Sequence, residues 1–465
     1  MVTELQTISP IDGRIVATRE LATPTEIEAT LNRAQAASQS WRRTPLSERI
    51  ERVRGFVDAF VAMNDQLVEE LAWQIGRPIR FGAGEIRGFE ERARHMIAIA
   101  EDSLADLQLP DKAGYIRYIK REPLGVVFTV AAWNYPYLIA VNSLVPALLA
   151  GNVVVLKHSA QTPLCAERLL EASVSAGLPD GVFQILHLSH GDAAKVVGDS
   201  RVNFVAFTGS VSGGRAIRRA ASERFIGIGL ELGGKDPAYV RPDANLQHAI
   251  ESLVDGSFFN SGQSCCGIER IYVHRDCYDD FVDGVVQETS GYILGDPMDP
   301  ATTLGPVVRK SAADGIRQQV EQALGLGARS LVDPDFFPAR GGTYIAPRVL
   351  VDVDHRMDVM SEETFGPVVG IMAVDDDDQA IERMNDSCYG LTASIWTADL
   401  DAAVAIGDQI QTGTWFMNRC DYLDPGLAWV GVKDSGVGCT LSQVGFEHLT
   451  RPKSYHLRTH VGDDV

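Results

Sequence analysis

Two apolar runs constrain the fold of this chain more than any other feature. Residues 125–130, Gly-Val-Val-Phe-Thr-Val, and residues 152–157, Asn-Val-Val-Val-Leu-Lys, carry β-branched side chains without polar alternation. Such runs are typical of parallel strands that are buried on both faces. The runs at 182–186 and 202–207 continue the pattern, with a helix expected over 163–176. We therefore predict an α/β protein, and such sheets bind ligands beyond the carboxyl ends of their strands.

Size, charge and cysteine content narrow the class of protein. A chain of 465 residues predicts two or three packed units, and a net charge of −20 argues against nucleic acid or an anionic membrane as partner. Seven cysteines without a Cys-x-x-Cys pair indicate neither a disulfide framework nor a metal site. The first residues lack the features of a signal peptide, and the apolar stretch 138–150 is too short to cross a bilayer. We expect a cytoplasmic protein.

A cysteine in a tight turn is the candidate nucleophile. Residues 258–267, Phe-Phe-Asn-Ser-Gly-Gln-Ser-Cys-Cys-Gly, place Cys265 just after an apolar run. A thiol there can attack while its own backbone N–H serves an oxyanion, although a free cysteine is more often buried and inert. Glu231 and Asn134 strengthen the catalytic interpretation, because a carboxylate and an amide complete a working set. For Asn134, which follows the run 125–130, capping of the next helix is the alternative.

The motifs around these residues resemble those of the aldehyde dehydrogenase superfamily. Asn260–Cys265 match its Asn-x-Gly-Gln-x-Cys pattern, and Glu231–Lys235 match Glu-Leu-Gly-Gly-Lys. The resemblance implies an aldehyde-dehydrogenase-like α/β fold, with a modified Rossmann cofactor domain, a second α/β catalytic domain and a small β arm for oligomerisation. The implied bounds are 1–110 with 126–230 for the cofactor domain, 231–425 for the catalytic domain, and 111–125 with 445–465 for the arm of a homodimer or homotetramer.

The resemblance also implies oxidation of an aldehyde to its acid, with hydride transfer to NAD or NADP. Cys265 would form a thiohemiacetal and then a thioester, and Glu231 would activate the water that hydrolyses the thioester. The Asn134 side chain and the Cys265 N–H would hold the oxyanion. Two other roles stay open: transfer of the acyl group to coenzyme A, which the retained Glu231 disfavours, and a non-catalytic structural role, which the intact catalytic set disfavours.

The cofactor-binding residues are implied in the same way. Residues 208–214, Thr-Gly-Ser-Val-Ser-Gly-Gly, join a strand to a helix, which on spacing alone is a weak indication of a pyrophosphate cradle. Ala160 replaces the glutamate that commonly binds the ribose, and so removes a carboxylate that would repel a 2′-phosphate. We expect NADP to be tolerated beside NAD, with no preference predicted. The implied residues are Trp133, Lys157, Ser159, Gly209, Ser210, Gly214, Glu363 and Phe365.

The substrate side is less determined. The polar residues of the loop 418–430 form either a polar entrance to the aldehyde tunnel or a solvated surface, and the sequence favours neither. Asn142 and Ser143 leave the helix after the first buried run without the basic residue of some relatives, which mildly disfavours a carboxylated aldehyde. Arg451 is aligned with a second, proton-relaying glutamate of many relatives, which leaves Glu231 as the expected sole base.

Overall fold

A hairpin and a layer of helices open the chain. The computed structural model of the protein describes residues 3–338 and 340–460. The hairpin pairs β1 (Glu4–Ile8) with β2 (Ile15–Glu20). Four helices follow, and their apolar faces share one core with the first large sheet: α1 (Pro24–Trp41), α2 (Leu46–Val61), α3 (Asn64–Ile75) and α4 (Ile79–Leu104).

A six-stranded sheet contains the predicted buried runs. Its order is β17-β9-β8-β5-β6-β7, and every neighbouring pair is parallel except β17 with β9. β5 and β6 are interior strands buried at every residue, which explains why their sequences do not alternate. The α/β prediction is confirmed for this sheet. The bounds are β5 (Val126–Ala131), β6 (Val153–His158), β7 (Phe183–Ile185), β8 (Val202–Thr208), β9 (Gly227–Glu231) and β17 (Gly436–Val437).

A second sheet of seven strands has the order β12-β13-β14-β11-β10-β15-β16. Its pairs are parallel except β12 with β13. Two apolar clusters of its own cover its two faces. The bounds are β10 (Asp236–Val240), β11 (Ile268–His274), β12 (Arg329–Ser330), β13 (Arg348–Val351), β14 (Val368–Val374), β15 (Thr392–Trp396) and β16 (Thr414–Met417).

The other helices connect these strands. They are α5 (Pro136–Leu149), α6 (Pro163–Ser175), α7 (His190–Gly198), α8 (Val211–Ala220), α9 (Leu246–Phe258), α10 (Tyr278–Ser290), α11 (Lys310–Gly325), α12 (Asp358–Ser361), α13 (Asp377–Asn385), α14 (Leu400–Gly407) and α15 (Ser442–His448). Short 3-10 turns are η1 (Phe259–Gly262), η2 (Arg275–Cys277), η3 (Pro334–Phe336) and η4 (Lys433–Ser435). None of the helices in the described ranges is long and apolar enough to span a membrane.

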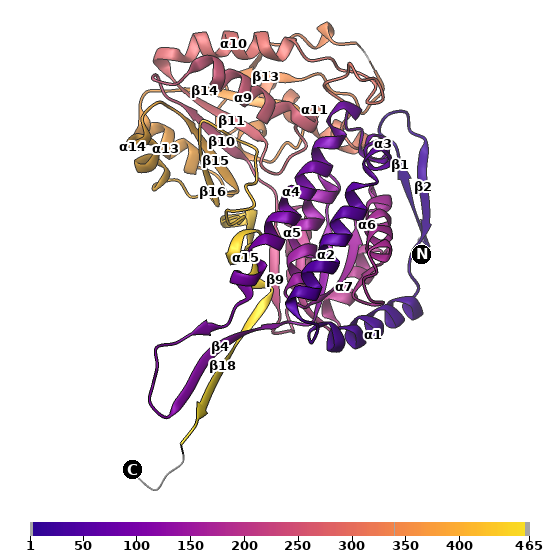
Figure 1. The fold of residues 1–465 in the computed structure, drawn as a ribbon. Helices are drawn as coiled ribbons and strands as arrows, with labels where there is room; N and C mark the ends of the chain where they lie inside the picture. Colours follow the sequence, from indigo (N-terminus) through magenta and orange to yellow (C-terminus); the bar gives the residue numbers. More distant parts are fainter. Residues whose placement is uncertain (1–2, 339, 461–465) are drawn as a thin grey trace.

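An antiparallel ribbon extends from the body of the molecule (Figure 1). It pairs β18 (Thr450–Arg458) with β4 (Tyr115–Pro123), and β3 (Leu107–Gln108) adds a short third strand. The predicted arm segment 445–465 includes residues 461–465, which lie outside the described residues. The predicted segment 1–110 includes residues 1–2, which lie outside them as well. The domain bounds and the role of the ribbon in oligomerisation stay predictions.

Candidate active site

The turn before the candidate nucleophile has an unusual backbone. Asn260, Ser261 and Gly262 have φ of +52°, +57° and +69°, a left-handed conformation that non-glycine residues keep only when their surroundings enforce it. A Cβ on Gly262 would collide with a carbonyl oxygen of the facing loop. The Gln263 side chain secures the turn: its Nε2 donates to the Asn260 carbonyl oxygen (3.0 Å), and its Oε1 accepts from the Val308 N–H (2.8 Å). The fixed residues of this motif therefore shape the turn that presents the thiol.

Asn134 lies against the same turn. Its side chain is only 4% exposed, and Nδ2 donates to the Gln263 carbonyl oxygen at 3.1 Å, which leaves the second Nδ2 hydrogen for another acceptor. The helix-cap alternative is wrong, because α5 begins after Tyr135 and has no side-chain cap. Arg77 donates to the Asn134 carbonyl oxygen and forms a buried ion pair with Glu85, so a buried and positioned donor fixes the backbone at Asn134.

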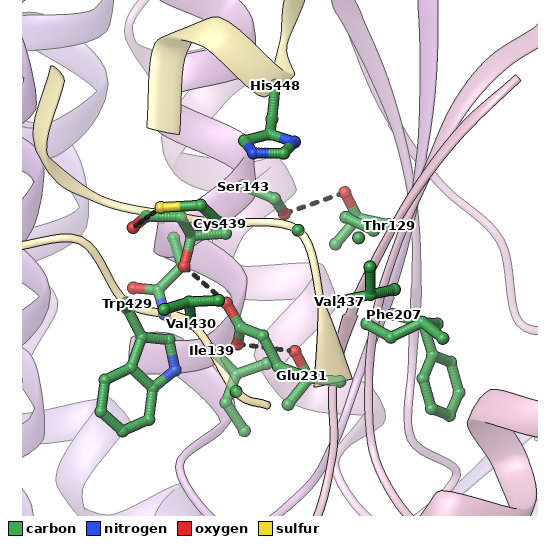
Figure 2. Close-up of a pocket in the computed structure, with 18 of the residues that line it drawn as sticks. Thr129, Ile139, Ser143, Phe207, Glu231, Trp429, Val430, Val437, Cys439 and His448 are labelled. Atoms are coloured by element: carbon green, nitrogen blue, oxygen red, sulfur yellow. Dashed lines mark hydrogen bonds between the residues drawn. The ribbon is translucent and has the colours of Figure 1, made fainter. Parts of the chain in front are cut away.

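Glu231 ends β9 and carries two hydrogen bonds from hydroxyl groups. Thr440 Oγ1 donates to Oε1 at 2.6 Å and Thr208 Oγ1 donates to Oε2 at 3.0 Å (Figure 2). Burial raises the pKa of Glu231 above its ordinary value, and the Thr440 and Thr208 bonds oppose that rise because they stabilise the carboxylate. Further along the same motif, a Cβ on Gly234 would collide with the carbonyl oxygen of Cys265, so a glycine there lets the two segments approach.

The Thr440 bond predicts a change in pH dependence. A Thr440→Val variant loses the donor that lowers the pKa of Glu231, so a base that works as a carboxylate will protonate at higher pH. We expect the acid limb of kcat to move upward by about one pH unit, the size of one charge-assisted hydrogen bond. Thr440→Ser keeps the hydroxyl and is the control. A Val variant whose acid limb coincides with that of the Ser variant would contradict this assignment.

Lys235 connects the Glu231 motif to the loop of Glu363. Its ammonium forms a buried ion pair with Glu269 and donates to Thr364 Oγ1 at 3.0 Å. Glu269 also accepts from the backbone N–H groups of Thr364 and Phe365, each at 2.9 Å. Glu363 accepts from a backbone N–H of the Glu231 motif at 3.1 Å, and burial, with the nearby charge of Glu269, raises its pKa to about 7. The Glu231 motif therefore positions the carboxylates of Glu269 and Glu363.

A cleft of about 540 Å³ opens in front of Glu231 and Cys265. At one side the rings of Trp133 and Phe365 meet edge to face, 5.6 Å between centroids. Ser210 caps α8 by accepting from a backbone N–H at 3.2 Å, and the amino end of a helix is a favourable place for an anionic group. Five of the eight predicted cofactor residues line this cleft: Trp133, Gly209, Ser210, Glu363 and Phe365.

The other three predicted cofactor residues lie outside the lining of this cleft. Gly214 is buried in α8, where a Cβ would collide with the Leu232 side chain, so a glycine there lets the helix pack closely. Lys157 is the penultimate residue of β6 and is 7% exposed, and its ammonium has no hydrogen-bond acceptor among the described residues. Burial lowers the pKa of Lys157. Ser159 Oγ accepts from a backbone N–H two residues on, at 3.2 Å, and Ala160 is exposed beside it.

A second cavity, of about 460 Å³, approaches Cys265 from the side of α4, α5 and the loop 418–430. Asp421 and Tyr422 of this loop line the cavity, whereas Arg419 stacks on the Tyr422 ring at 3.6 Å. Tyr422 also donates to Glu91 of α4 at 2.8 Å, which ties the loop to the helix across the mouth. Asp421 and Tyr422 thus form a polar wall of the cavity, whereas Arg419 belongs to an outer layer of the loop. The polar entrance and the solvated surface, which the sequence left as alternatives, therefore apply to different residues.

Asp421 connects this cavity to the nucleophile turn. It accepts from Ser264 Oγ at 2.9 Å and from Cys266 Sγ at 3.0 Å, so its carboxylate contacts both neighbours of Cys265. Burial raises the pKa of Asp421 to about 6, against the opposing effect of these two donors. Cys266 therefore belongs to the support of the turn.

Arg92 of α4 is a site residue that the sequence interpretation missed. Its side chain is 8% exposed and lines the second cavity, and Nη1 donates to the Leu138 carbonyl oxygen (2.9 Å) and to Asn142 Oδ1 (3.1 Å). No carboxylate in the described ranges forms an ion pair with it. The available indication was a charged residue at helical spacing on the buried stripe of α4 beside Phe89.

Arg451 does not lie at a relay position beside Glu231, whereas Glu231 as the sole base stays a prediction. Arg451 lies in β18 and pairs with Glu122 at 3.3 Å, and it lines none of the cavities at Glu231. The residue that contacts Glu231 from the C-terminal segment is Thr440. The short loop between β17 and α15 brings it there, a contact that sequence separation does not reveal.

The two cavities meet at four residues. Asn134, Thr208, Glu231 and Cys265 line both the cleft and the second cavity. The structure therefore brings together all three predicted catalytic residues, at the place where two ligands entering from opposite sides would touch. A nucleophile, a base and an amide donor in that position suit a two-substrate acyl chemistry.

Comparison with known proteins agrees with this geometry. The model of the aldehyde dehydrogenase family matches residues 2–455. A protein of Mycobacterium tuberculosis named NADP(+) succinate-semialdehyde dehydrogenase 1 is 34% identical over 455 residues, 97% of this chain and 99% of its own. The solved structure of an NADP-dependent enzyme of E. coli has a TM-score of 0.94 at 28% identity, covering 98% of this chain and 95% of that one. That of betaine aldehyde dehydrogenase from Staphylococcus aureus, in complex with NAD+, has a TM-score of 0.93 at 26% identity, covering 99% and 92%.

The chain therefore belongs to the aldehyde dehydrogenase family. Within that family it is an enzyme, an aldehyde dehydrogenase, and its α/β fold is that of the family's solved structures. The predicted family, enzyme class and fold class are confirmed.

Proposed function

We propose that this protein oxidises an aldehyde to its carboxylic acid with NAD or NADP, using Cys265 as nucleophile and Glu231 as base. The observation that carries the proposal is the meeting of two cavities at Asn134, Glu231 and Cys265. The cleft would hold the nicotinamide, which accepts a hydride when bound, and the second cavity would hold the aldehyde.

In the first half of the reaction, the Cys265 thiolate attacks the aldehyde carbon and forms a C–S bond. The developing oxyanion is held by the free Nδ2 hydrogen of Asn134 and by the Cys265 N–H, and Asn134 is oriented by its bond to Gln263. Donors fixed before the reaction stabilise such charge without reorganisation. Loss of the hydride from the adduct carbon restores the carbonyl group and leaves a thioester on Cys265.

In the second half, Glu231 removes a proton from a water molecule while that water forms the new C–O bond. The C–S bond then breaks, the acid is released and the Cys265 thiolate is regenerated. The carboxylate of Glu231 is aimed by Thr440 and Thr208, so it holds one position while it works as a base. This series of reaction steps needs no coenzyme A, which distinguishes it from the acyl-transferring alternative.

For the cofactor, we propose that NADP is accepted because the 2′-phosphate meets no carboxylate at position 160. Lys157, buried without an acceptor among the described residues, and Ser159 are the donors available beside Ala160. These groups fit a phosphate or a ribose, and the names of the mycobacterial and E. coli proteins, which include NADP, support acceptance of the phosphorylated form.

An Ala160→Glu variant tests this proposal. We expect kcat/KM for NADP to fall on the order of tenfold or more while that for NAD is kept or rises, because a new carboxylate repels the phosphate and accepts from the ribose. Ala160→Gln, of equal size without charge, is the matched control. Equal losses in the Glu and Gln variants would show a steric effect instead.

For the aldehyde, Arg92 changes the expectation that the lack of a basic residue in α5 disfavours a carboxylated substrate. That helix indeed carries Asn142 in place of a cation, but Arg92 brings a guanidinium from α4 to the same point and holds Asn142. We propose that a short aldehyde bearing a carboxylate is a substrate, as the name of the succinate-semialdehyde relative suggests for that protein. Asp421 lines the same cavity, so an amino-bearing aldehyde is the competing class.

The function is tested by following nicotinamide reduction with carboxylated, amino-bearing, aliphatic and aromatic aldehydes, each with NAD and NADP. Carboxylated aldehydes are expected to have the highest kcat/KM. A preference for amino-bearing aldehydes would mean that Asp421 dominates the cavity. Absence of reduction with every aldehyde, with and without coenzyme A, would overturn the proposed reaction.

We also propose the domain assignment that the family implies. Residues 1–110 and 126–230 would bind the cofactor, 231–425 would carry the nucleophile, and 111–125 with 445–465 would join copies into a homodimer or homotetramer. The projecting ribbon of β4 and β18 supports this last point (Figure 1), since a two-sided ribbon is stable only when further surface covers it.

A further inference from the structure

Glu231 has to release a proton in every cycle, and its two front cavities do not offer an open path. During hydrolysis of the thioester the cleft holds the cofactor and the second cavity holds the acyl group, which follows from the proposed function on which this inference rests. Glu231 is largely enclosed by protein, and the surface that it does expose faces cavities. A proton left on a buried base blocks the next turnover.

A third, small cavity lies behind Glu231. Its volume is about 30 Å³, enough for one water molecule. Figure 2 shows Glu231 at one side of it, the hydroxyls of Thr129 and Ser143 in its middle part, and His448 on the far side. These two hydroxyls are 3.1 Å apart and hydrogen-bonded to each other, so they provide both a donor and an acceptor to a water beside them.

His448 is the group through which this cavity reaches the surface. It is the last residue of α15 and is exposed to solvent, yet it lines the cavity. Besides Glu231, the titratable side chains that line the cavity are Cys439 and His448. The Cys439 thiol is directed to a carbonyl oxygen, 3.4 Å away, and burial raises its pKa to about 11, which makes it a poor proton carrier near neutral pH.

We propose that the proton of Glu231 leaves through this rear cavity, by way of a water molecule at the Thr129–Ser143 hydroxyl pair, to His448 and then to solvent. The O–H bond of the protonated carboxyl breaks as the water takes the proton, and the water passes a proton to an imidazole nitrogen. His448 then loses a proton to buffer, so the carboxylate is restored with no change in oxidation state. Imidazole is suited to this role because its two ring nitrogens can take up one proton and release another.

The test is a His448→Gln variant, assayed with the best aldehyde and cofactor of the wild-type protein. We expect the rapid first turnover of nicotinamide reduction to be unchanged and the steady-state kcat to fall about tenfold, because acylation does not use the rear route whereas regeneration of the base does. Added imidazole buffer should restore kcat in proportion to its concentration, and should leave the wild-type rate unaffected. Gln443→Ala, an exposed change on α15 away from the cavity, is the matched control.

A second variant keeps the test decisive in the case that solvent water accepts the proton from the rear cavity when His448 is absent. Thr129→Val with Ser143→Ala removes both hydroxyls and should slow steady-state turnover without imidazole rescue, since the defect lies inside the protein. Wild-type kcat in both variants, or a fall that imidazole does not relieve in His448→Gln, would overturn the proposal. Lack of aldehyde oxidation by the wild-type protein would instead contradict the proposed function.

Discussion

A Cys265→Ala variant is expected to lose steady-state aldehyde oxidation by about four orders of magnitude or more, as removal of a catalytic nucleophile generally does. Cys265 lines both large cavities and is presented by three consecutive left-handed residues. No other thiol lines both of them in the described ranges, so none can take its place. The measurement is nicotinamide absorbance at saturating substrate, together with cofactor binding to show that the variant keeps its fold.

The adjacent thiol provides the matched control. Cys266 donates to Asp421 and faces away from the cofactor cleft. Cys266→Ala should retain turnover within about tenfold of wild type, because it removes a positioning contact and no reacting atom. A loss in Cys266→Ala comparable with that of the Cys265 variant would contradict the assignment of the nucleophile.

A Glu231→Gln variant is expected to separate the two halves of the reaction. Acylation needs no base at Glu231, so one equivalent of reduced nicotinamide per site should form at a rate near that of wild type. The steady-state rate should then fall by about 10²–10⁴-fold, the range for loss of a general base. Rapid mixing with detection of nicotinamide absorbance resolves both phases.

The glutamine variant is well matched because its amide can keep contacts to Thr440 and Thr208, whose hydroxyls both donate and accept. Loss of the rapid phase along with the steady state would place Glu231 in acylation instead of hydrolysis. Added coenzyme A that restores turnover in this variant would favour the acyl-transferring alternative.

The strands and catalytic motifs of this chain could be predicted because their causes are local. Residues 126–131 and 153–158 are rich in β-branched and other apolar side chains because they lie inside a parallel sheet, and a segment buried on two faces typically has such a composition. Cys265, Glu231 and Asn134 sit in short motifs whose glycines and amides are required by close backbone approaches, such as that of Gly234 to Cys265. Local sequence was sufficient for these features.

The contacts that complete the site could not be predicted because they join distant segments. Thr440 lies 209 residues from Glu231 in sequence and Arg92 lies 50 from Asn142, and neither pair has a spacing that would indicate contact. The sequence comparison placed Arg451 where a relay group was expected, whereas the loop before α15 brings Thr440 there. Gly214 matches a cofactor motif, and its close approach to the Leu232 side chain was not evident from the sequence. Tertiary packing decides each of these cases.

The most direct test of the central claim is the mass of the protein after Glu231→Gln is mixed with the best aldehyde and cofactor and quenched in acid. The account predicts an added acyl group on nearly every chain, and peptide mapping should place it on Cys265. An unmodified protein after one equivalent of nicotinamide has been reduced, or an acyl group on Cys266, would contradict the claim that a Cys265 thioester is hydrolysed by Glu231.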